Sequence, residues 1–163
     1  MRHFTEPGVR APLVQPTLHA MGRLGQKTGK GYYRYEPGKR APIVDPEVTA
    51  LIVDASRAAG IERRTIADDE IRDRLILPMI NEGAKLVEEG IVERASDIDL
   101  VWQFGYGWPD WKGGPMYHAD TLGAATVVER LQALRSAHGE RFQPAGLLVR
   151  LARSGQGLTL PTP

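Results

Sequence analysis

The chain has 163 residues, enough for one compact domain or two very small ones. Its 21 Lys and Arg residues nearly balance its 20 Asp and Glu residues, so the charge does not favour a nucleic-acid or membrane-surface protein. The absence of cysteine excludes a disulfide framework, a cysteine-based zinc site and a thiol nucleophile. No apolar run is long enough to span a bilayer and the start carries no secretory signal, so we expect a cytoplasmic protein without a transmembrane segment.

Residues 1–44 are rich in proline and glycine, which break helices and favour turns. We expect an irregular segment here, with an extended aromatic run over residues 31–36. The segment 25–31, Gly-Gln-Lys-Thr-Gly-Lys-Gly, is compared with a phosphate-binding loop, in which four residues separate the glycines before Lys and Ser or Thr. Here only three residues separate the glycines and Lys30 precedes another glycine, so the sequence favours a tight turn. Lys27 and Lys30 stay as candidate cationic contacts for a substrate or another domain.

The first helix is predicted to follow Asp45, a good N-cap, with Pro46 as its first residue and Gly60 at its end. The strongest helical pattern starts near Asp68 or Asp69 and ends at Gly90. Two adjacent apolar stripes in this segment predict a long helix at the centre of a bundle, kinked at its internal proline.

Further helices follow along the chain. Ser96 is expected to cap a third helix that ends at Gly105. The glycines, prolines and aromatic residues of 105–115 indicate an ordered loop held by aromatic packing. One helical turn at 116–120, a helix over 122–138, a helix from Pro144 to Gly155 and a frayed tail complete the chain. About five helices and no clear strand pair predict an all-α protein, organised as an irregular segment 1–44, a helical domain 45–157 and a tail 158–163.

Three polar residues stand out near apolar positions. Asn81 and Glu82 lie close to the apolar stripes of the long helix, so they either bind the backbone near Gly113 and Gly114 or face a ligand. His118 follows the aromatic loop and is interpreted as either structural or part of a site. The four histidines include no pair at metal-ligand spacing with a carboxylate, and neither a dinucleotide fingerprint nor a Gly-x-Ser-x-Gly motif occurs. The residues therefore assign no catalytic, metal-binding or cofactor-binding group.

A set of motifs carries a resemblance when its members are taken in chain order. They are Glu70-Ile-Arg-Asp-Arg-Leu-Ile-Leu-Pro-Met-Ile-Asn-Glu-Gly83, Leu86-Val-Glu-Glu-Gly-Ile91, Asp97-Ile-Asp99, Gly105-Tyr-Gly-Trp-Pro109 and Gly113-Gly-Pro115. This set resembles the C-terminal helical domain of 3-hydroxyacyl-CoA dehydrogenases, and more narrowly the second helical repeat of multifunctional fatty-acid β-oxidation enzymes. The stretch Gly22–Tyr35 is similar to the end of the first repeat in that family. The fold implied is a helical bundle resembling the 6-phosphogluconate dehydrogenase C-terminal-like domain.

The resemblance also implies what this chain lacks. In the family, the NAD-binding domain precedes the helical repeats and carries the catalytic histidine and its glutamate partner. An active repeat has an Asn-Arg pair early in its long helix, and the matching pair here is Asp73-Arg74. An ionised aspartate cannot offer the amide donor of asparagine, which suits a non-catalytic second repeat.

The function implied is therefore the helical part of an NAD-dependent oxidoreductase of fatty-acid oxidation, inactive alone, that supplies packing and walls for the acyl-CoA site. The NAD-binding and hydratase domains of the parent enzyme, and a thiolase subunit, are the implied partners. Lys27, Lys30, Asp73, Asn81, Glu82 and His118 are the candidate substrate or domain-interface residues. Two alternatives stay open: a stand-alone helical module that dimerises or binds a partner, and a chain that binds acyl-CoA alone through Lys27, Lys30 and the aromatic loop.

Overall fold

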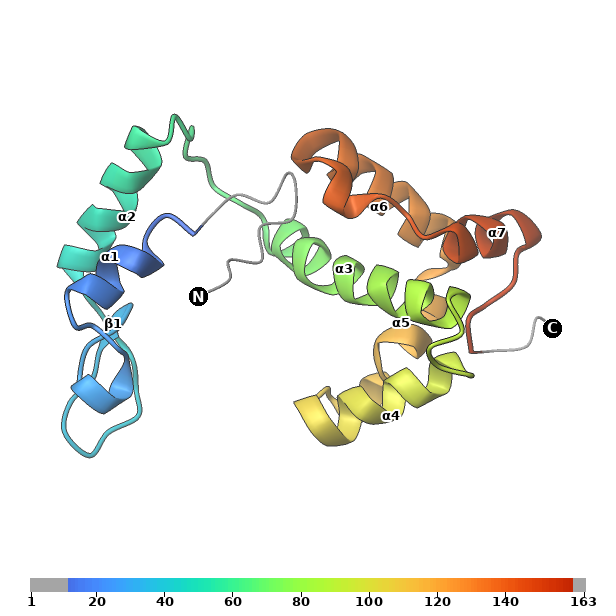
Figure 1. The fold of residues 1–163 in the computed structure, drawn as a ribbon, viewed down its shortest axis with the longest axis horizontal. Helices are drawn as coiled ribbons and strands as arrows, with labels where there is room; N and C mark the ends of the chain where they lie inside the picture. The colour runs from blue at the N-terminus through green and yellow to red at the C-terminus, as the bar shows by residue number, and fades with distance from the viewer. Residues whose placement is uncertain (1–11, 160–163) are drawn as a thin grey trace. The chain divides into compact units, whose positions relative to one another are not determined.

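The computed structural model describes residues 12–159, which fall into two compact units divided between Thr65 and Ile66 (Figure 1). The all-α prediction is confirmed, because the described part contains seven α-helices and only two strands, each of two residues. No helix within residues 12–159 is both long enough and apolar enough to cross a membrane.

The first unit is built around a small hairpin. Its elements are α1 (Gln15–Ala20), the 3₁₀ helix η1 (Gln26–Thr28), β1 (Tyr33–Arg34), β2 (Ile43–Val44) and α2 (Pro46–Ala58). The strands β1 and β2 are antiparallel, with Tyr33 opposite Val44. The aromatic run is thus extended at its centre, as expected, whereas its pairing with a second strand was not predicted, since two residues give too short a pattern.

A buried arginine joins the parts of this unit. Arg23 donates from Nε to the carbonyl oxygen of Gly31 at 3.0 Å and forms ion pairs with the carboxylates of Asp45 and Glu47. Asp45 accepts the backbone N–H of Glu47 at 3.1 Å, which confirms it as the N-cap of α2. Arg23 thus fixes the start of α2, and residues 45–65 fall in the first compact unit.

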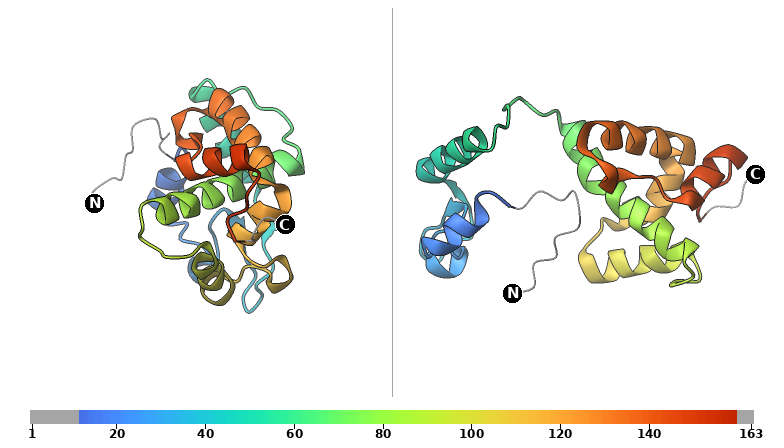
Figure 2. Two further views of the ribbon diagram at one scale, coloured as in Figure 1. Left: turned by 90° about the vertical axis from the view of Figure 1, so that its right-hand side faces the viewer. Right: turned by 45° about the horizontal axis from the view of Figure 1, so that its top comes forward.

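The second unit is a helical bundle around α3 (Asp68–Glu88). It continues with α4 (Ala95–Tyr106), η2 (Asp110–Lys112), α5 (Pro115–Leu122), α6 (Ala124–His138), η3 (Glu140–Phe142) and α7 (Gly146–Ser154). The helix α3 contacts α4, α5, α6 and α7, and in each view it lies between α4 and the pair α6–α7 (Figures 1 and 2). The predicted central helix is therefore confirmed, and it continues past Pro78.

One apolar cluster fills the bundle. Its fully buried members come from α3, α5, α6 and α7, and they are Leu77, Ile80, Ala84, Met116, Ala119, Val127, Leu131 and Leu148. Removing this much apolar side chain from water is the main stabilising contribution to such a unit. The predicted apolar stripes of α3 are confirmed only in part: Ile80 and Gly83 are buried, whereas Ile71 and Leu75 are exposed and the buried Leu77 and Ala84 lie on neither stripe.

The cap predicted for α4 is wrong. The helix begins at Ala95 with Arg94 in the N-cap position, and it ends at Tyr106, beyond Gly105, with Gly107 at a left-handed φ of 72° as its C-cap. The buried acid of this helix, Asp99, accepts the backbone N–H groups of Met116 and Tyr117 at 2.6 and 3.0 Å. Asp99 therefore caps α5, a role that depends on a contact between distant segments.

Two further boundaries differ from the prediction. The single turn expected at 116–120 is the eight-residue helix α5, and the last helix begins at Gly146 rather than Pro144. In the described part of the predicted tail, Asp120 accepts the backbone N–H groups of Leu158 and Thr159 at 2.6 and 2.7 Å. Residues 160–163 lie outside the described range.

Candidate functional site

A polar cleft of about 480 Å³ lies in the second unit, where α3, η2, α5 and α6 meet. Its lining residues are Asp69, Arg72, Asp73, Ile76, Leu77, Lys112, His118, Leu122 and Arg130. The cleft brings together two of the residues singled out in the sequence, Asp73 from α3 and His118 from α5. It is therefore the candidate functional site.

Ion pairs balance most of the charge in this cleft. Asp73 pairs with Arg130 at 3.2 Å between Oδ1 and Nη1, and Asp69 pairs with Arg72 one helical turn along α3. The Lys112 ammonium has no carboxylate partner within residues 12–159 and lies 4.9 Å from the centre of the Trp111 ring. The cleft thus presents one unpaired positive charge.

His118 lies on α5 beside that charge. Its Nδ1 is 3.3 Å from the hydroxyl oxygen of Thr121, whose hydroxyl also donates to the His118 carbonyl at 2.7 Å. Burial lowers the pKa of the His118 imidazole below its usual 6.5, and the charge of Lys112 lowers the pKa further. The neutral imidazole is therefore favoured near pH 7, and His118 adds no positive charge to the cleft.

An apolar slot of about 300 Å³ adjoins the cleft and shares Arg72, Ile76, Lys112 and His118 with it. Its other walls are Met79, Trp102, Tyr106, Gly107, Trp108 and Pro109. The ring centres of Trp102 and Trp108 are 6.3 Å apart, and those of Trp108 and His118 are 6.1 Å apart. Aromatic packing thus holds part of the predicted ordered loop, although Trp111 is 81% exposed.

Asn81 and Glu82 do not line the cleft. The buried amide of Asn81 donates to the carbonyl oxygen of Gln143 at 2.9 Å and accepts the N–H of Ala145 at 2.7 Å. Glu82 is exposed and pairs with Lys85 at 3.3 Å. Neither side chain binds the Gly113–Gly114 backbone, where Asp99 closes the turn instead.

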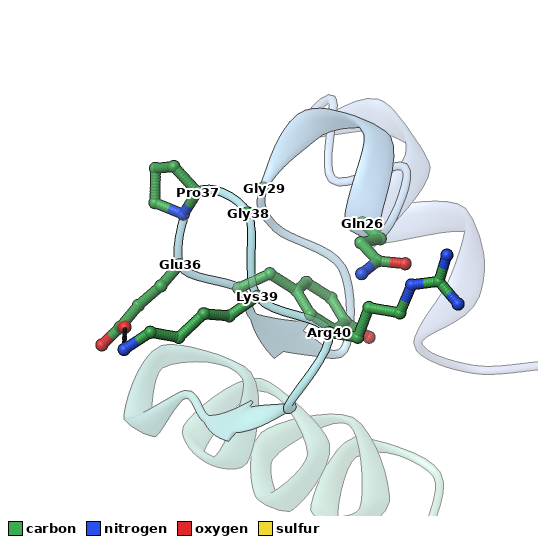
Figure 3. Close-up of a pocket in the computed structure, with 8 residues that line it drawn as sticks. Gln26, Gly29, Glu36, Pro37, Gly38, Lys39 and Arg40 are labelled. Carbon is green, nitrogen blue, oxygen red and sulfur yellow. Dashed lines mark ion pairs between the residues drawn. The ribbon is translucent and has the colours of Figure 1, made fainter.

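Lys27 and Lys30 lie in the first unit and are exposed. The segment between Gly25 and Lys30 is the expected tight turn, closed by a 2.8 Å hydrogen bond from the N–H of Gly25 to the carbonyl oxygen of Lys30. Figure 3 shows the nearby hollow of about 420 Å³, where Lys39 pairs with Glu36. Neither predicted lysine lines it, so the structure does not bring Lys27 and Lys30 to a described pocket.

Sequence reasoning missed three basic residues of the cleft, Arg72, Lys112 and Arg130. Lys112 lies within the aromatic loop that the sequence had singled out, and Arg72 precedes Asp73. Arg130 lies on an exposed part of α6, and its pairing with Asp73, 57 residues away in the sequence, cannot be predicted from the sequence alone. Trp108 was not singled out within the aromatic loop, because its burial depends on the packing of that loop.

Comparison with known families identifies the second unit. The family described as 3-hydroxyacyl-CoA dehydrogenase, C-terminal domain, matches residues 71–157, more than half of the chain. The chain belongs to this family.

The relatives agree with this membership. The human peroxisomal bifunctional enzyme is 39% identical over 145 residues, which are 87% of this chain and 20% of that protein. The fatty acid oxidation complex subunit alpha of Shewanella frigidimarina is 39% identical over 146 residues, again 20% of its length. The chain therefore spans about a fifth of these relatives.

A solved structure extends the agreement to the fold. The dehydrogenase part of multifunctional enzyme 1 from C. elegans matches with a TM-score of 0.63 and 28% identity, over 88% of this chain and 33% of that one. The chain is thus similar to the C-terminal helical part of fatty-acid β-oxidation enzymes, as the motifs predicted.

In this 3-hydroxyacyl-CoA dehydrogenase C-terminal domain, the carboxylate of Asp73 forms an ion pair within the domain. Arg130 holds the Asp73 carboxylate, and the next residue, Arg74, pairs with Glu70 at 2.6 Å and contacts the His138 ring. Both members of the Asp73–Arg74 pair therefore have partners within the domain.

Proposed function

We propose that this chain is the C-terminal helical part of an NAD-dependent 3-hydroxyacyl-CoA dehydrogenase, where it supplies packing and walls for the acyl-CoA site. The observation that carries the proposal is the family match over residues 71–157 in a chain spanning about a fifth of its relatives. The whole reaction transfers hydride from the 3-hydroxyacyl carbon to NAD. We expect this chain to contribute shape and positioning rather than a reacting group.

The described residues do not fit an NAD site. A dinucleotide fold needs parallel strands with a glycine-rich turn leading into a helix. Residues 12–159 form only the antiparallel two-residue strands β1 and β2, and the turn at Gly25–Lys30 leads into an extended segment. In our proposal, NAD and the catalytic groups belong to another part of the parent enzyme.

The six candidate residues from the sequence differ in the contacts that we propose for them. Asp73 and His118 line the cleft, so they are proposed as contacts for substrate or for a neighbouring domain. Lys27 and Lys30 are exposed cations and are proposed as domain-interface residues. Asn81 and Glu82 have internal partners, and we propose that Asn81 acts only by fixing the backbone before α7.

The partners and compartment follow from the parent enzyme. We propose association with NAD-binding and hydratase domains, and with a thiolase subunit in a larger complex. A cytoplasmic location is proposed for this chain, although its relatives include enzymes named as peroxisomal. Fluorescence imaging of the tagged chain in its own cells tests the compartment.

The experiment measures NAD reduction by absorbance with a 3-hydroxyacyl-CoA substrate. The chain alone is expected to give no turnover, whereas a parent enzyme that keeps its NAD-binding domain gives turnover as a matched control. Removal of the region equivalent to residues 71–157 from that parent is expected to lower activity strongly. Turnover by the chain alone, or full activity of the shortened parent, would contradict the proposal.

A second function is favoured by one surface. The outer face of α4 exposes Leu100, Val101 and Phe104, the last at 85%. Contiguous exposed apolar side chains mark protein interfaces. A stand-alone dimerising or partner-binding module is therefore the alternative, and a solution mass of twice the monomer, without affinity for acyl-CoA, would favour it.

A further inference from the structure

The slot contains a buried donor without an acceptor. Trp108 is only 9% exposed, and its indole Nε1–H has no hydrogen-bond partner in the part of the chain that the structure describes. Leaving a buried donor unpaired costs free energy, so such groups are uncommon in native proteins. The indole ring of Trp108 forms one wall of the slot, so the slot lies against this unsatisfied residue.

The junction between slot and cleft is positively charged. Lys112 and Arg72 line both hollows, but Asp69 pairs with Arg72, whereas no carboxylate among the described residues pairs with Lys112. Neutral His118, the other polar residue common to both, does not offset this charge. The junction is therefore complementary to an anion.

The remaining walls of the slot are apolar and set the size of its occupant. Ile76, Met79, Trp102 and Tyr106 present aliphatic and aromatic surface. A volume of about 300 Å³ accommodates about ten groups of the size of a water molecule. An apolar chain of that size would remove its own surface and that of the walls from water.

We propose that the slot binds an amphipathic carboxylate, with an apolar chain against Trp102 and Trp108 and the carboxylate at Lys112. The chain and head together amount to about ten heavy atoms. This binding requires neither NAD nor any other domain, so it goes beyond the proposed function. Octanoate, with eight carbons and two oxygens, is the probe of matching size.

The test titrates the ¹⁵N-labelled full chain with octanoate and follows the indole N–H signals of its three tryptophans by NMR. Saturable binding is expected, with the largest shift at Trp108, because its ring is a wall of the slot and would contact the bound apolar chain. Butanoate is expected to bind at least 50-fold more weakly, since each methylene contributes about fourfold. Octan-1-ol is expected to bind about tenfold more weakly because it lacks the charge-assisted contact.

Two variants locate the head group. Lys112→Met is expected to weaken octanoate binding about tenfold and to leave octan-1-ol binding unchanged. Lys85→Met is the matched control, since Lys85 lies on α3 outside both hollows, and it is expected to leave both affinities unchanged. Circular dichroism of each variant checks that the helices are retained.

Several results would overturn the proposal. They are octylammonium binding as tightly as octanoate, an unmoved Trp108 signal at saturation, or equal losses for octanoate and octan-1-ol in Lys112→Met. Binding of octanoyl-CoA without binding of octanoate would also overturn it, while supporting the acyl-CoA walls proposed above. The two proposals can therefore fail separately.

Discussion

At the scale of single residues, Asn81 shows how a polar side chain inside an apolar helix face contributes to the fold. Its amide satisfies one carbonyl and one N–H in the segment that leads from η3 into α7. That segment, residues 143–145, is irregular backbone, whose polar groups need partners when buried. The Asn81 amide therefore provides the hydrogen-bond donor and acceptor that a neighbouring β-strand would otherwise provide for this backbone.

Replacing Asn81 by leucine is expected to lower the free energy of unfolding by about 2–3 kcal/mol, because the new side chain leaves two backbone groups without partners. Urea denaturation followed by circular dichroism measures the change. Glu82→Gln is the control, and its exposed ion pair predicts a change of less than about 0.5 kcal/mol. Equal effects of the two substitutions would show that Asn81 has no special role.

At the scale of elements, the turn before α5 depends on one glycine. Gly114 has a φ of 98°, and a Cβ there would lie 2.4 Å from the Asp99 carboxylate that caps the helix. Gly123, at the other end of α5, has a φ of 84° but open space around it. An alanine at Gly123 would therefore meet backbone strain only, whereas an alanine at Gly114 would meet backbone strain and a steric clash.

Gly123→Ala is expected to cost about 1–2 kcal/mol through backbone strain alone. Gly114→Ala is expected to cost at least about 2 kcal/mol more than that, because it also displaces Asp99 from Met116 and Tyr117. Thermal or urea unfolding of both variants measures the difference. Similar values for the two would mean that the Asp99 cap adjusts without loss.

The start of α2 is expected to respond to acid. The side-chain hydrogen bond from Arg23 is the largest cause that holds the pKa of Asp45 below its usual 3.8, while burial opposes it. A lowered folded-state pKa stabilises the fold above pH 3.8, and this contribution is lost as the pH falls through the folded-state value. Protection of the α2 amides should therefore decrease between pH 5 and pH 3.

Hydrogen exchange of residues 46–58, corrected for intrinsic rates, measures that decrease. Asp45→Asn keeps an N-cap side chain but cannot lose a charge, so its protection should vary much less with pH over this range. Equal pH dependence in the two proteins would assign the effect to other carboxylates.

The positions of the helices were largely predictable from capping residues and glycines near their ends. The long-range hydrogen-bond partners of buried side chains were not predictable. Asp45 with Pro46 marked the start of α2, and Gly90 and Gly155 marked two helix ends, because caps and left-handed glycines act within one turn. The roles of Asp99 and Asp120 depend on backbone groups many residues away. No spacing in the sequence reveals such pairs.

The candidate site was predicted only in part for the same reason. Asp73 and His118 were singled out, and they do meet in one cleft. Lys112 was inside the aromatic loop, but its unpaired charge is visible only once the partners of Arg72 and Arg130 are known. The family resemblance, in contrast, depends on the order of short motifs and was confirmed over residues 71–157.

At the scale of the whole molecule, the two units differ in how much apolar surface they bury. The cluster around Leu77 and Leu148 belongs to the second unit, whereas Leu18 and Val48 are the buried apolar side chains within residues 12–65 of the first. Since apolar burial dominates folding free energy, the first unit should open more readily.

Hydrogen exchange by mass spectrometry is expected to show stronger protection in α3, α5 and α6 than in α1 and α2. Opening of the first unit is expected at lower urea concentration than unfolding of the second, so the transition should not be two-state. A single coincident transition for peptides from both units would contradict this expectation.

The contact of Asp120 with Leu158 and Thr159 has a practical consequence for labelling. Both N–H groups and the Thr159 hydroxyl donate to one carboxylate. A dye or affinity tag joined beyond residue 159 would leave this anchorage intact, whereas trimming the chain after Gly157 would strip three donors from Asp120. Shortened versions made for crystallisation should therefore retain Thr159.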